Sequence, residues 1–525
     1  MGTYSTMAAQ ATAQRRLASV ASQVALAAPP PDWDGALQAL QAIFPPEQLS
    51  LDLPTREQYG TGWGSLLPPA PPHAVVHAVR TEDVVKVVRV ATRFGVVIIP
   101  TGGRTALEGQ FQASCCNAPA GDWWTGGAKD DDEERPREAK KSGATRLQRP
   151  TIQISLSRMN EVIAIYEQDF QAVVQPGIGW QGLNELLAKR GIKLFFPVDP
   201  APGSQFGGMA GVAGSGTNAV GYGTLRAEWI QSMEVVLMNG DVIRTRGSNR
   251  ARKSSTGWDT GRLFLGSEGT LGIITELTVR LAPVLPLKVA LTSFSTISQA
   301  VSTVVSILIS GLSPTSLELL DGTSIRGLNL ARILDEQLIE EPTVLMRFSN
   351  ASEELNAENL RKVKRIVEEN GGRELRVARD EKENEELWKA RKARGDVCIP
   401  ISRLAEFISR SDTYVSSSGL VAPIVAHIGD GNVHRAILWK GREGETKSPK
   451  EVEELAKKLV ELAQELEGSC AGEHGIGLTK RKYLRAELGE GTLALMRTVK
   501  SVLDPLNLLN PDKVLFPEGE EEREQ

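Results

Sequence analysis

Cysteine and histidine are scarce in this sequence, and long apolar runs are missing from it. Its 525 residues include four cysteines and five histidines. The cysteines show no CxxC spacing, and so few of them fit a reducing compartment better than a disulfide framework. No apolar run is long enough to span a bilayer. The net charge is −5 and no basic face with interleaved aromatic residues appears, so nothing in the sequence indicates nucleic-acid binding.

The length and composition are typical of a soluble protein with more than one domain. Hydrophobic residues make up 41% and charged residues 24% of the chain, as in ordinary globular proteins. Residues 1–50 are rich in alanine and proline, and we predict a leader there. Arg15 and Arg16 precede the first acidic residue, Asp32, which indicates a mitochondrial presequence. The alternative is a disordered N-terminus on a cytoplasmic protein.

The pattern from about residue 68 onward predicts an α+β fold in two domains. In the first, residues 68–285, a strand, a helix capped by Thr81 and another strand follow one another. Residues 112–150 are charged and glycine-spotted, which predicts a disordered insertion. The second domain, residues 286–520, has strand-like runs at 287–294 and 343–349 and helical patterns at 295–311, 352–370 and 451–466. We expect the active site between the two domains.

A glycine-rich segment, FFPVDPAPGSQFGGMAGVAGSGTNAVGYGTLR, occupies residues 195–226. Its glycine density predicts backbone that passes tightly around a ligand, with free N–H groups of the kind that hold phosphate. The alternative is a structural turn. Residues 214–219 also match the GxGxxA dinucleotide fingerprint, which would suit a nicotinamide-dependent dehydrogenase, but no clear strand precedes them.

Two of the five histidines bracket an Asp-Gly pair in AHIGDGNVHRA, residues 426–436. Asp-Gly favours a type I′ hairpin turn with positive φ at both residues. With Asp430 and Gly431 at the tip, His427 would stand directly opposite His434, where two neutral imidazoles can share a metal ion. A cross-strand aromatic pair without a metal is the alternative.

A third histidine lies in GSCAGEHGIG, residues 468–477. There Glu473 and His474 can supply a third metal ligand and a nearby base, and the flanking glycines let the backbone approach a ligand closely. The alternative is a glycine-rich turn with incidental polar residues.

Motifs in a fixed order carry a family resemblance. PTGGRTALEG, FFPVDPAPGSQFGGMAG, SGTNAVGYGTLR, KSSTGWDTGRLFLGSEGTLGIITE, HIGDGNVH, GEHGIGLTK and LDPLNLLNPDKV together resemble the FAD-dependent D-lactate dehydrogenases of the vanillyl-alcohol-oxidase superfamily. D-2-hydroxyglutarate dehydrogenase and the glycolate oxidase flavin subunit are similar too. The resemblance covers roughly residues 68–520. It implies a PCMH-type FAD-binding domain of two α+β subdomains, followed by an α+β substrate domain of the FAD-linked oxidase C-terminal type.

The resemblance also implies roles for individual residues. The pyrophosphate of a dissociable FAD would lie on Thr101, Gly102, Gly103, Arg104 and Thr105. The flavin would be lined by Pro197, Asp199, Gly207, Gly208, Gly214, Thr217, Asn218, Glu268, Gly269, Gly272, Ile274 and Asn510. His427, His434 and Glu473 would bind a divalent metal, zinc or manganese. His474 would be the base, and Arg391 would hold the substrate carboxylate.

The implied reaction is oxidation of D-lactate, or of a similar D-2-hydroxy acid, to the 2-oxo acid. Hydride would pass to flavin N5, and electrons would then pass to cytochrome c or a quinone. D-2-hydroxyglutarate and glycolate are alternative substrates, and a homodimer is compatible with the resemblance.

Two departures from the family pattern leave another reading open. Arg104 stands where similar proteins have the third glycine of a GGG run, and a non-glycine residue with φ > 0 costs about 1–2 kcal/mol. The segment LWKARKARGDVCIP is shorter than in those proteins. A flavin-binding paralogue with a damaged substrate pocket is therefore the non-enzymatic alternative.

Overall fold

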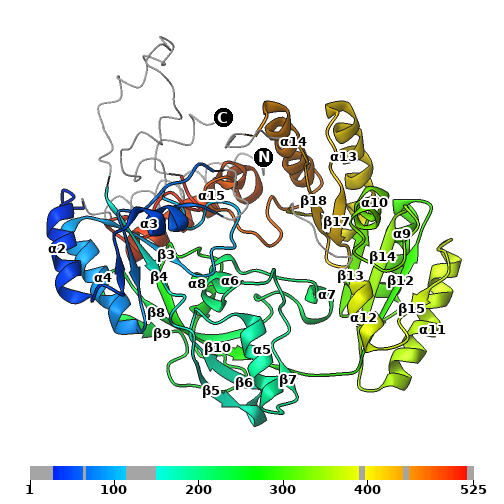
Figure 1. Ribbon diagram of the computed structural model, residues 1–525, viewed down its shortest axis with the longest axis horizontal. Coiled ribbons are helices and arrows are strands. Elements are labelled where there is room, and N and C mark those ends of the chain that lie inside the picture. The colour runs from blue at the N-terminus through cyan, green and yellow to red at the C-terminus, as the bar shows by residue number, and fades with distance from the viewer. Residues whose placement is uncertain (1–27, 63–66, 114–148, 389–395, 441–447, 517–525) are drawn as a thin grey trace, which may run out of the picture.

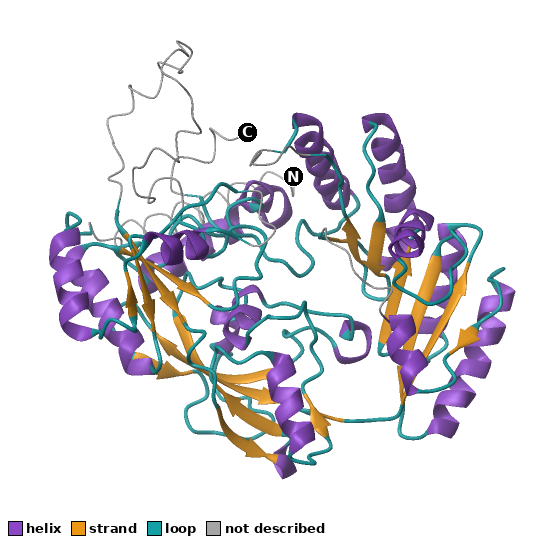
Figure 2. Cartoon of the chain, in the orientation of Figure 1, coloured by secondary structure: helices purple, strands orange, loops and turns teal. Residues whose placement is uncertain are grey.

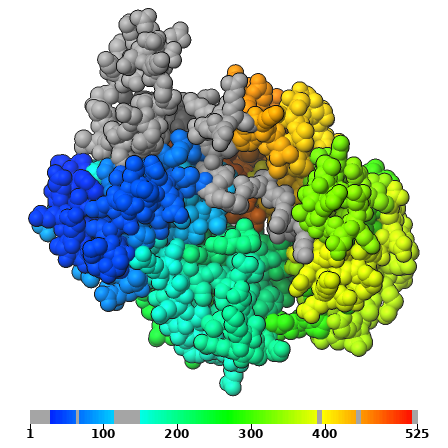
Figure 3. Space-filling model, in the orientation of Figure 1, coloured from blue at the N-terminus to red at the C-terminus, as the bar shows by residue number. Residues whose placement is uncertain are grey.

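A computed structural model describes residues 28–62, 67–113, 149–388, 396–440 and 448–516. Its described elements form three groups around three main sheets (Figures 1 and 2). The space-filling view shows the two N-terminal groups, blue and cyan to green, beside the C-terminal domain, which runs from yellow-green to orange (Figure 3). Within the described residues no helix combines the length and apolar character needed to cross a bilayer.

The first group contains a four-stranded sheet in the order β1-β2-β4-β3, whose last three strands run parallel. Its strands are β1 (Leu49–Ser50), β2 (Ala74–His77), β3 (Val97–Thr101) and β4 (Thr151–Ser155), and its helices are α2 (Trp33–Ile43), α3 (Leu53–Gly60) and α4 (Thr81–Phe94). The valines of α4 recur at helical spacing, and Val84, Val87 and Val88 are fully buried against the sheet. Gly95, with φ 64°, ends this helix.

Two predictions about this group need correction. The leader predicted over residues 1–50 is too long, because Ala36 and Leu40 of α2 are fully buried in the first core. Thr81 is the first residue of α4 and not its cap, and its hydroxyl donates to Glu234 instead. The predicted disordered insertion at 112–150 lies almost wholly outside the described residues.

The second group is an antiparallel sheet in the order β5-β6-β10-β8-β9. The turn that contains Asn239 and Gly240 joins β8 to β9, which pair as an antiparallel hairpin. The elements are β5 (Val162–Tyr166), β6 (Gln171–Val174), α5 (Trp180–Lys189), β7 (Leu194–Phe195), α6 (Phe206–Val212), α7 (Ala219–Tyr222), β8 (Ile230–Val236), β9 (Val242–Arg244), α8 (Gly261–Phe264), β10 (Ile273–Arg280) and β11 (Ala282–Pro283).

The C-terminal domain is built on a seven-stranded sheet, β15-β12-β14-β13-β17-β18-β16. Its strands are β12 (Leu287–Ser293), β13 (Ser316–Leu320), β14 (Thr343–Ser349), β15 (Arg376–Val377), β16 (Val397–Cys398), β17 (Ile424–His427) and β18 (Asn432–Arg435). One face packs on α9 (Ile297–Ile309), α11 (Glu353–Glu369), α13 (Leu404–Ser418) and α14 (Lys450–Glu465). The other face packs on α10 (Gly322–Ala331) and α12 (Glu381–Trp388).

The chain returns to the first group after α15 (Leu484–Leu503). The Ile98 amide of β3 donates to Leu508 O over 2.8 Å, and the Asn510 amide donates to Ile98 O over 2.7 Å. The segment that follows α15 thus connects the C-terminal domain back to the first sheet.

The histidine hairpin forms, but with a different register from the one predicted. His427 stands opposite Asn432, and His434 stands opposite Val425. The loop has four residues, and the amides of Asp430 and Gly431 both donate to His427 O. In this described loop only Gly431 has a positive φ, 87°, so the predicted type I′ turn is wrong. A shift of two residues preserves the face of every side chain, so both histidines still share one face.

Gly431→Ala should destabilise the protein by more than about 2 kcal/mol in chemical unfolding. A Cβ at Gly431 would lie 2.0 Å from the carbonyl oxygen of Ile399, and the left-handed backbone adds about 1–2 kcal/mol. Gly419→Ala is the matched control, since Gly419 also has a positive φ, 71°, but a Cβ there meets no described atom within 4 Å. Equal losses in the two variants would contradict the packing argument.

Candidate metal and flavin site

His427 and His434 lie diagonally across the hairpin. Their ring centroids are 4.9 Å apart and their planes are almost perpendicular, at 88°. Both residues are buried. Two imidazoles from adjacent strands of one sheet therefore approach each other in a place with little access to water.

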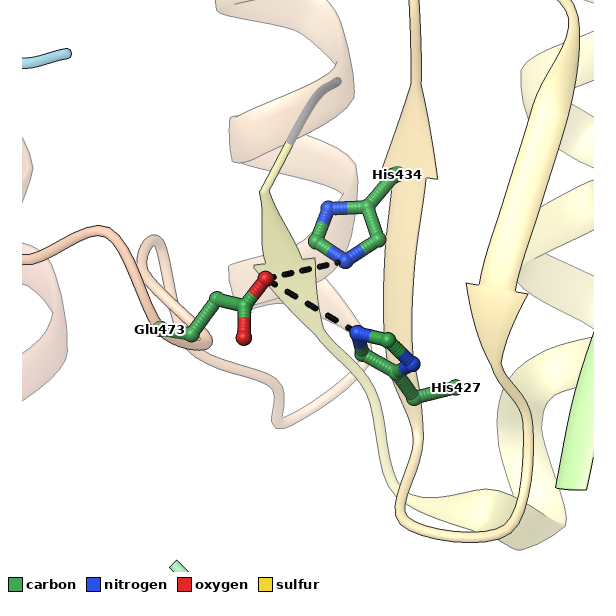
Figure 4. A group of neighbouring side chains, drawn as sticks. All are labelled: His427, His434 and Glu473. Atoms are coloured by element: carbon green, nitrogen blue, oxygen red, sulfur yellow. Dashed lines mark ion pairs between the residues drawn. The ribbon is translucent and has the colours of Figure 1, made fainter. Parts of the chain in front are cut away.

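Glu473 completes a group of three, as Figure 4 shows. Its Oε1 lies 3.7 Å from His427 Nε2 and 3.4 Å from His434 Nε2. One ligand atom from each residue lies within 4.8 Å of the others. His427 Nε2 is buried and has no hydrogen-bond partner among the described residues, which is costly unless another group satisfies it. Two imidazole nitrogens and a carboxylate oxygen suit a divalent cation such as zinc.

Glu318 fixes the orientation of His427. Its Oε1 lies 2.6 Å from His427 Nδ1, and its side chain is fully buried in β13. A carboxylate on Nδ1 selects the tautomer and turns Nε2 toward a metal. Sequence reasoning missed Glu318. The signal was a single acidic residue in an otherwise apolar strand, SLELL.

The charges of the cluster oppose one another. Burial alone would lower the pKa of His427, but Glu318 and Glu473 raise it well above its ordinary value. Burial, with the neighbouring imidazoles, lowers the pKa of His434 to about 4. Burial would raise the pKa of Glu473, yet the surrounding histidines hold it well below the usual range. The site therefore holds an ionised Glu473 beside a neutral His434, whereas His427 keeps a proton that a bound cation would have to displace.

His474 stands at the edge of this cluster. Its Nε2 lies 3.5 Å from Glu473 Oε1, and its ring centroid is 5.6 Å from that of His434. About 23% of its side chain is exposed, more than for the other two histidines. Burial opposes its charged form, but Asp396 and Glu473 raise its pKa above the ordinary value. An imidazole placed here can take up a proton.

Asp396 is a second residue that sequence reasoning missed. It precedes β16, and its side chain is 1% exposed. Its carboxylate accepts hydrogen bonds from the amides of three consecutive residues, 472 to 474, over 2.9, 2.9 and 3.0 Å. The motif DVCIPISRL contains it, but no local pattern indicates that it reaches a loop more than seventy residues later.

The predicted pyrophosphate loop, Thr101–Thr105, begins at the last residue of β3. Gly103 lies so close to the opposite segment that a Cβ would be 2.3 Å from Gly203 O. The Thr101 hydroxyl is buried without a hydrogen-bond partner in the described part of the chain. A narrow backbone approach and an unsatisfied hydroxyl fit a bound phosphate.

Arg104 adopts φ 58°, so the position does use the left-handed region. Its Nη1 donates to Gln58 O over 2.8 Å, and its guanidinium lies 4.3 Å from the centre of the Tyr59 ring. The side chain therefore turns toward α3 and packs there, and the cation–π contact offsets part of the backbone strain.

The glycine-rich segment is held together by its own polar side chains. Thr217 Oγ1 and the Asn218 amide donate to the Asp199 carboxylate over 2.5 and 3.0 Å, and Asn218 Nδ2 donates to Pro197 O over 3.0 Å. Gly207 packs on Pro176, whereas a Cβ on Gly208 would meet no described atom within 4 Å. Open space beside Gly208 fits a bound cofactor.

The same segment touches the cluster of His427, His434 and Glu473. Ser215 Oγ donates to Glu473 Oε2 over 3.2 Å, and a Cβ on Gly214 would lie 3.9 Å from Glu473 O. Residues 214–219 follow helix α6 and lead into α7, which has four residues. The strand–turn–helix context of a dinucleotide fingerprint is absent from these described residues, which argues against the nicotinamide alternative.

Of the remaining predicted flavin residues, Glu268 and Asn510 link the two domains, and the others pack inside the first domain. The Glu268 carboxylate accepts from the amides of Ile476 and Gly477 over 2.6 and 2.8 Å. Asn510 Nδ2 donates to Glu268 O and Gln110 O over 2.7 and 3.0 Å. Gly269 has φ 70° and lies on Pro100, Gly272 lies on Val235, and Ile274 is buried in the second core. Arg391, the predicted substrate arginine, lies outside the described residues.

Comparison with known proteins decides the family. Residues 287–514 match "FAD linked oxidases, C-terminal domain", and residues 138–246 match "FAD binding domain". The mitochondrial D-lactate dehydrogenase (cytochrome) of Arabidopsis thaliana is 37% identical over 462 residues, which are 85% of this chain and 74% of that protein. The chain belongs to the FAD-dependent D-lactate dehydrogenase family. It is therefore an oxidoreductase with an FAD-binding domain.

Other members of this FAD-linked family are similar over most of the chain. The mitochondrial D-lactate dehydrogenase (cytochrome) 1 of Saccharomyces cerevisiae is 33% identical, covering 84% of this chain and 72% of that protein. The D-2-hydroxyglutarate dehydrogenase of Stutzerimonas stutzeri is 27% identical, covering 91% of this chain and 98% of that protein.

Solved structures confirm the predicted fold class. The 4-ethylphenol oxidase from Gulosibacter chungangensis superposes with a TM-score of 0.71 at 19% identity, covering 94% of this chain and 99% of that one. p-Cresol methylhydroxylase superposes with a TM-score of 0.70 at 16% identity, covering 92% and 97%. The two α+β subdomains followed by an α+β domain thus share the fold of these two proteins.

Proposed function

We propose that this protein oxidises D-lactate, or a similar D-2-hydroxy acid, to the 2-oxo acid, using FAD and a divalent cation. The observation that carries the proposal is the placement of His474 within 3.5 Å of Glu473, at the edge of the cluster His427, His434 and Glu473. A proton acceptor beside a cation site is what removal of a proton from a 2-hydroxy acid requires.

The three clustered residues would hold the cation, with Glu318 behind His427. A bound divalent cation would supply positive charge that lowers the pKa of the substrate hydroxyl and favours the neutral form of His474. Bound FAD would supply the acceptor for the hydrogen and two electrons that leave the carbinol carbon. In this scheme His474 Nε2 takes the hydroxyl proton, and Arg391 binds the substrate carboxylate.

The contact of Ser215 with Glu473 supports a short path between substrate and flavin. It joins the predicted flavin wall to the metal ligand, so a substrate at the cation would lie beside the cofactor. The names of the relatives support a cytochrome as the final electron acceptor and a mitochondrial location.

An anaerobic titration of the FAD-loaded protein tests the proposal. D-Lactate should bleach the visible flavin band, L-lactate should not, and chelation of the metal should slow the bleaching until Mn²⁺ or Zn²⁺ is restored. D-2-Hydroxyglutarate and glycolate complete the panel, because two relatives are named as enzymes of these acids. A flavin that none of these acids reduces would contradict the dehydrogenase and favour a flavin-binding protein without turnover.

A further inference from the structure

The loop that carries Glu473 and His474 is held by two buried carboxylates, one from each domain. Asp396 of the C-terminal domain binds the amides of residues 472–474, and Glu268 of the FAD-binding domain binds those of 476 and 477. Five of the six amides from 472 to 477 thus donate to only two side chains. The loop contains three glycines, so its conformation depends on such contacts.

Asp396 holds the half of the loop that faces the metal cluster. Asn432 Nδ2 donates to its Oδ1 over 3.0 Å, and Lys480 Nζ donates to its Oδ2 over 3.2 Å. The space is filled, because a Cβ on Gly472 would lie 1.9 Å from Asn432 Nδ2. These contacts fix the backbone at Glu473, and the backbone position determines how far its carboxylate extends toward the two histidines.

Glu268 holds the half of the loop that lies on the FAD-binding domain. It precedes β10, has φ 52°, and its carbonyl accepts from Asn510 Nδ2. A Cβ on Gly475 would lie 2.6 Å from Glu268 Oε1. Glu268 thus has a strained backbone that Asn510 holds in place, and its side chain binds the loop. It therefore fixes the position of the loop relative to the flavin domain.

We propose that Asp396 and Glu268 are positioning residues with separate tasks, Asp396 aligning Glu473 and His474 with the metal and Glu268 anchoring the following half of the loop on the flavin domain. The inference rests on the proposed function, because both tasks concern the loop that carries its metal ligand and its base. A displacement of about 1 Å between reacting groups can cost about 100-fold in rate. A carboxylate that fixes the position of this loop can therefore affect the rate without touching the substrate.

The test compares Asp396→Asn and Glu268→Gln in the FAD-loaded protein. Calorimetry with Mn²⁺ or Zn²⁺ measures metal affinity, steady-state kinetics with D-lactate separates kcat from KM, and hydrogen exchange reports on the loop amides. Asp396→Asn should weaken metal binding by about 10–100-fold and lower kcat, as loss of an orienting partner does. Glu268→Gln should lower kcat by a similar factor, leave KM and metal affinity within about threefold, and speed exchange at residues 476 and 477.

Asp83→Asn is the matched control, since Asp83 is a buried aspartate that accepts from the amide of Val79 in the first subdomain. It should change thermal stability only. Wild-type metal affinity in Asp396→Asn, wild-type kcat in Glu268→Gln, or an equal loss of metal affinity in Asp83→Asn would overturn the proposal. If Asp396→Asn does not fold, Asn432→Ala removes one donor to Asp396 and should weaken metal binding in the same direction; unchanged binding would count against Asp396.

These readouts separate this inference from the proposed function. If wild type does not oxidise D-lactate, metal affinity and hydrogen exchange still test both carboxylates. If wild type turns over and the variants match it, the proposed function stands and the positioning roles fall.

Discussion

Glu473→Gln should lower the affinity for Mn²⁺ or Zn²⁺ by at least about 100-fold and abolish metal-dependent turnover. Within the described parts of the chain Glu473 supplies the one negative ligand grouped with both imidazoles, and a neutral amide cannot replace its charge. The variant also loses the partner that holds His474 Nε2. Calorimetric titration of the metal-stripped, FAD-loaded protein measures the affinity directly.

Glu487→Gln is the control for that experiment. Glu487 accepts from the amide of Cys470 over 2.8 Å, so it supports the segment that leads into the same loop. It should retain metal affinity within a few fold. A Glu473→Gln variant that binds metal as wild type does would remove the metal centre from the proposed function.

The hairpin shows how far local sequence reasoning reaches. Residue types and strand alternation correctly placed two histidines on one face, because a register error of two residues preserves that face. The predicted direct pairing of His427 with His434 was wrong, because the chain forms a four-residue loop and not the two-residue turn that Asp-Gly favours. In that loop the carbonyl of His427 accepts hydrogen bonds from two amides. Gly431 packs against Ile399, a contact that the local sequence does not predict.

The residues that sequence reasoning missed share one cause. Glu318 reaches His427 across 109 positions, and Asp396 reaches the loop of His474 across 78. Glu318 lies within a short apolar strand and Asp396 directly precedes one, and only the three-dimensional arrangement reveals their partners. Helices with strong periodicity, such as α9, α11 and α14, were predicted within about two residues of their ends, because burial of one face determines them locally.

Part of the predicted leader folds because it is an amphipathic helix that buries one face. The stretch from Trp33 to Ile43 has apolar residues at helical spacing, capped by Asp32, whose carboxylate accepts from the Gly35 amide over 2.9 Å. The alanine- and proline-rich composition around it hid this pattern. Ala36 and Leu40 find their partners in α4 and the first sheet, which a reading of composition alone cannot supply.

His474→Ala should lower kcat for D-lactate by about 10²–10⁴-fold, the usual worth of a general base, while metal affinity stays within a few fold. The separation is expected because the three ligand atoms come from other residues, whereas His474 Nε2 meets the cluster only through Glu473. Steady-state kinetics and calorimetry on the same preparation measure both quantities, so retained metal binding also shows that the loop has folded. His73→Gln serves as a distant histidine control, since His73 Nδ1 accepts from the Thr151 amide in the first subdomain, and its kcat should match wild type. Equally slow turnover in wild type and His474→Ala would instead identify a flavin protein that has lost the reaction, since the base would then have nothing to accelerate.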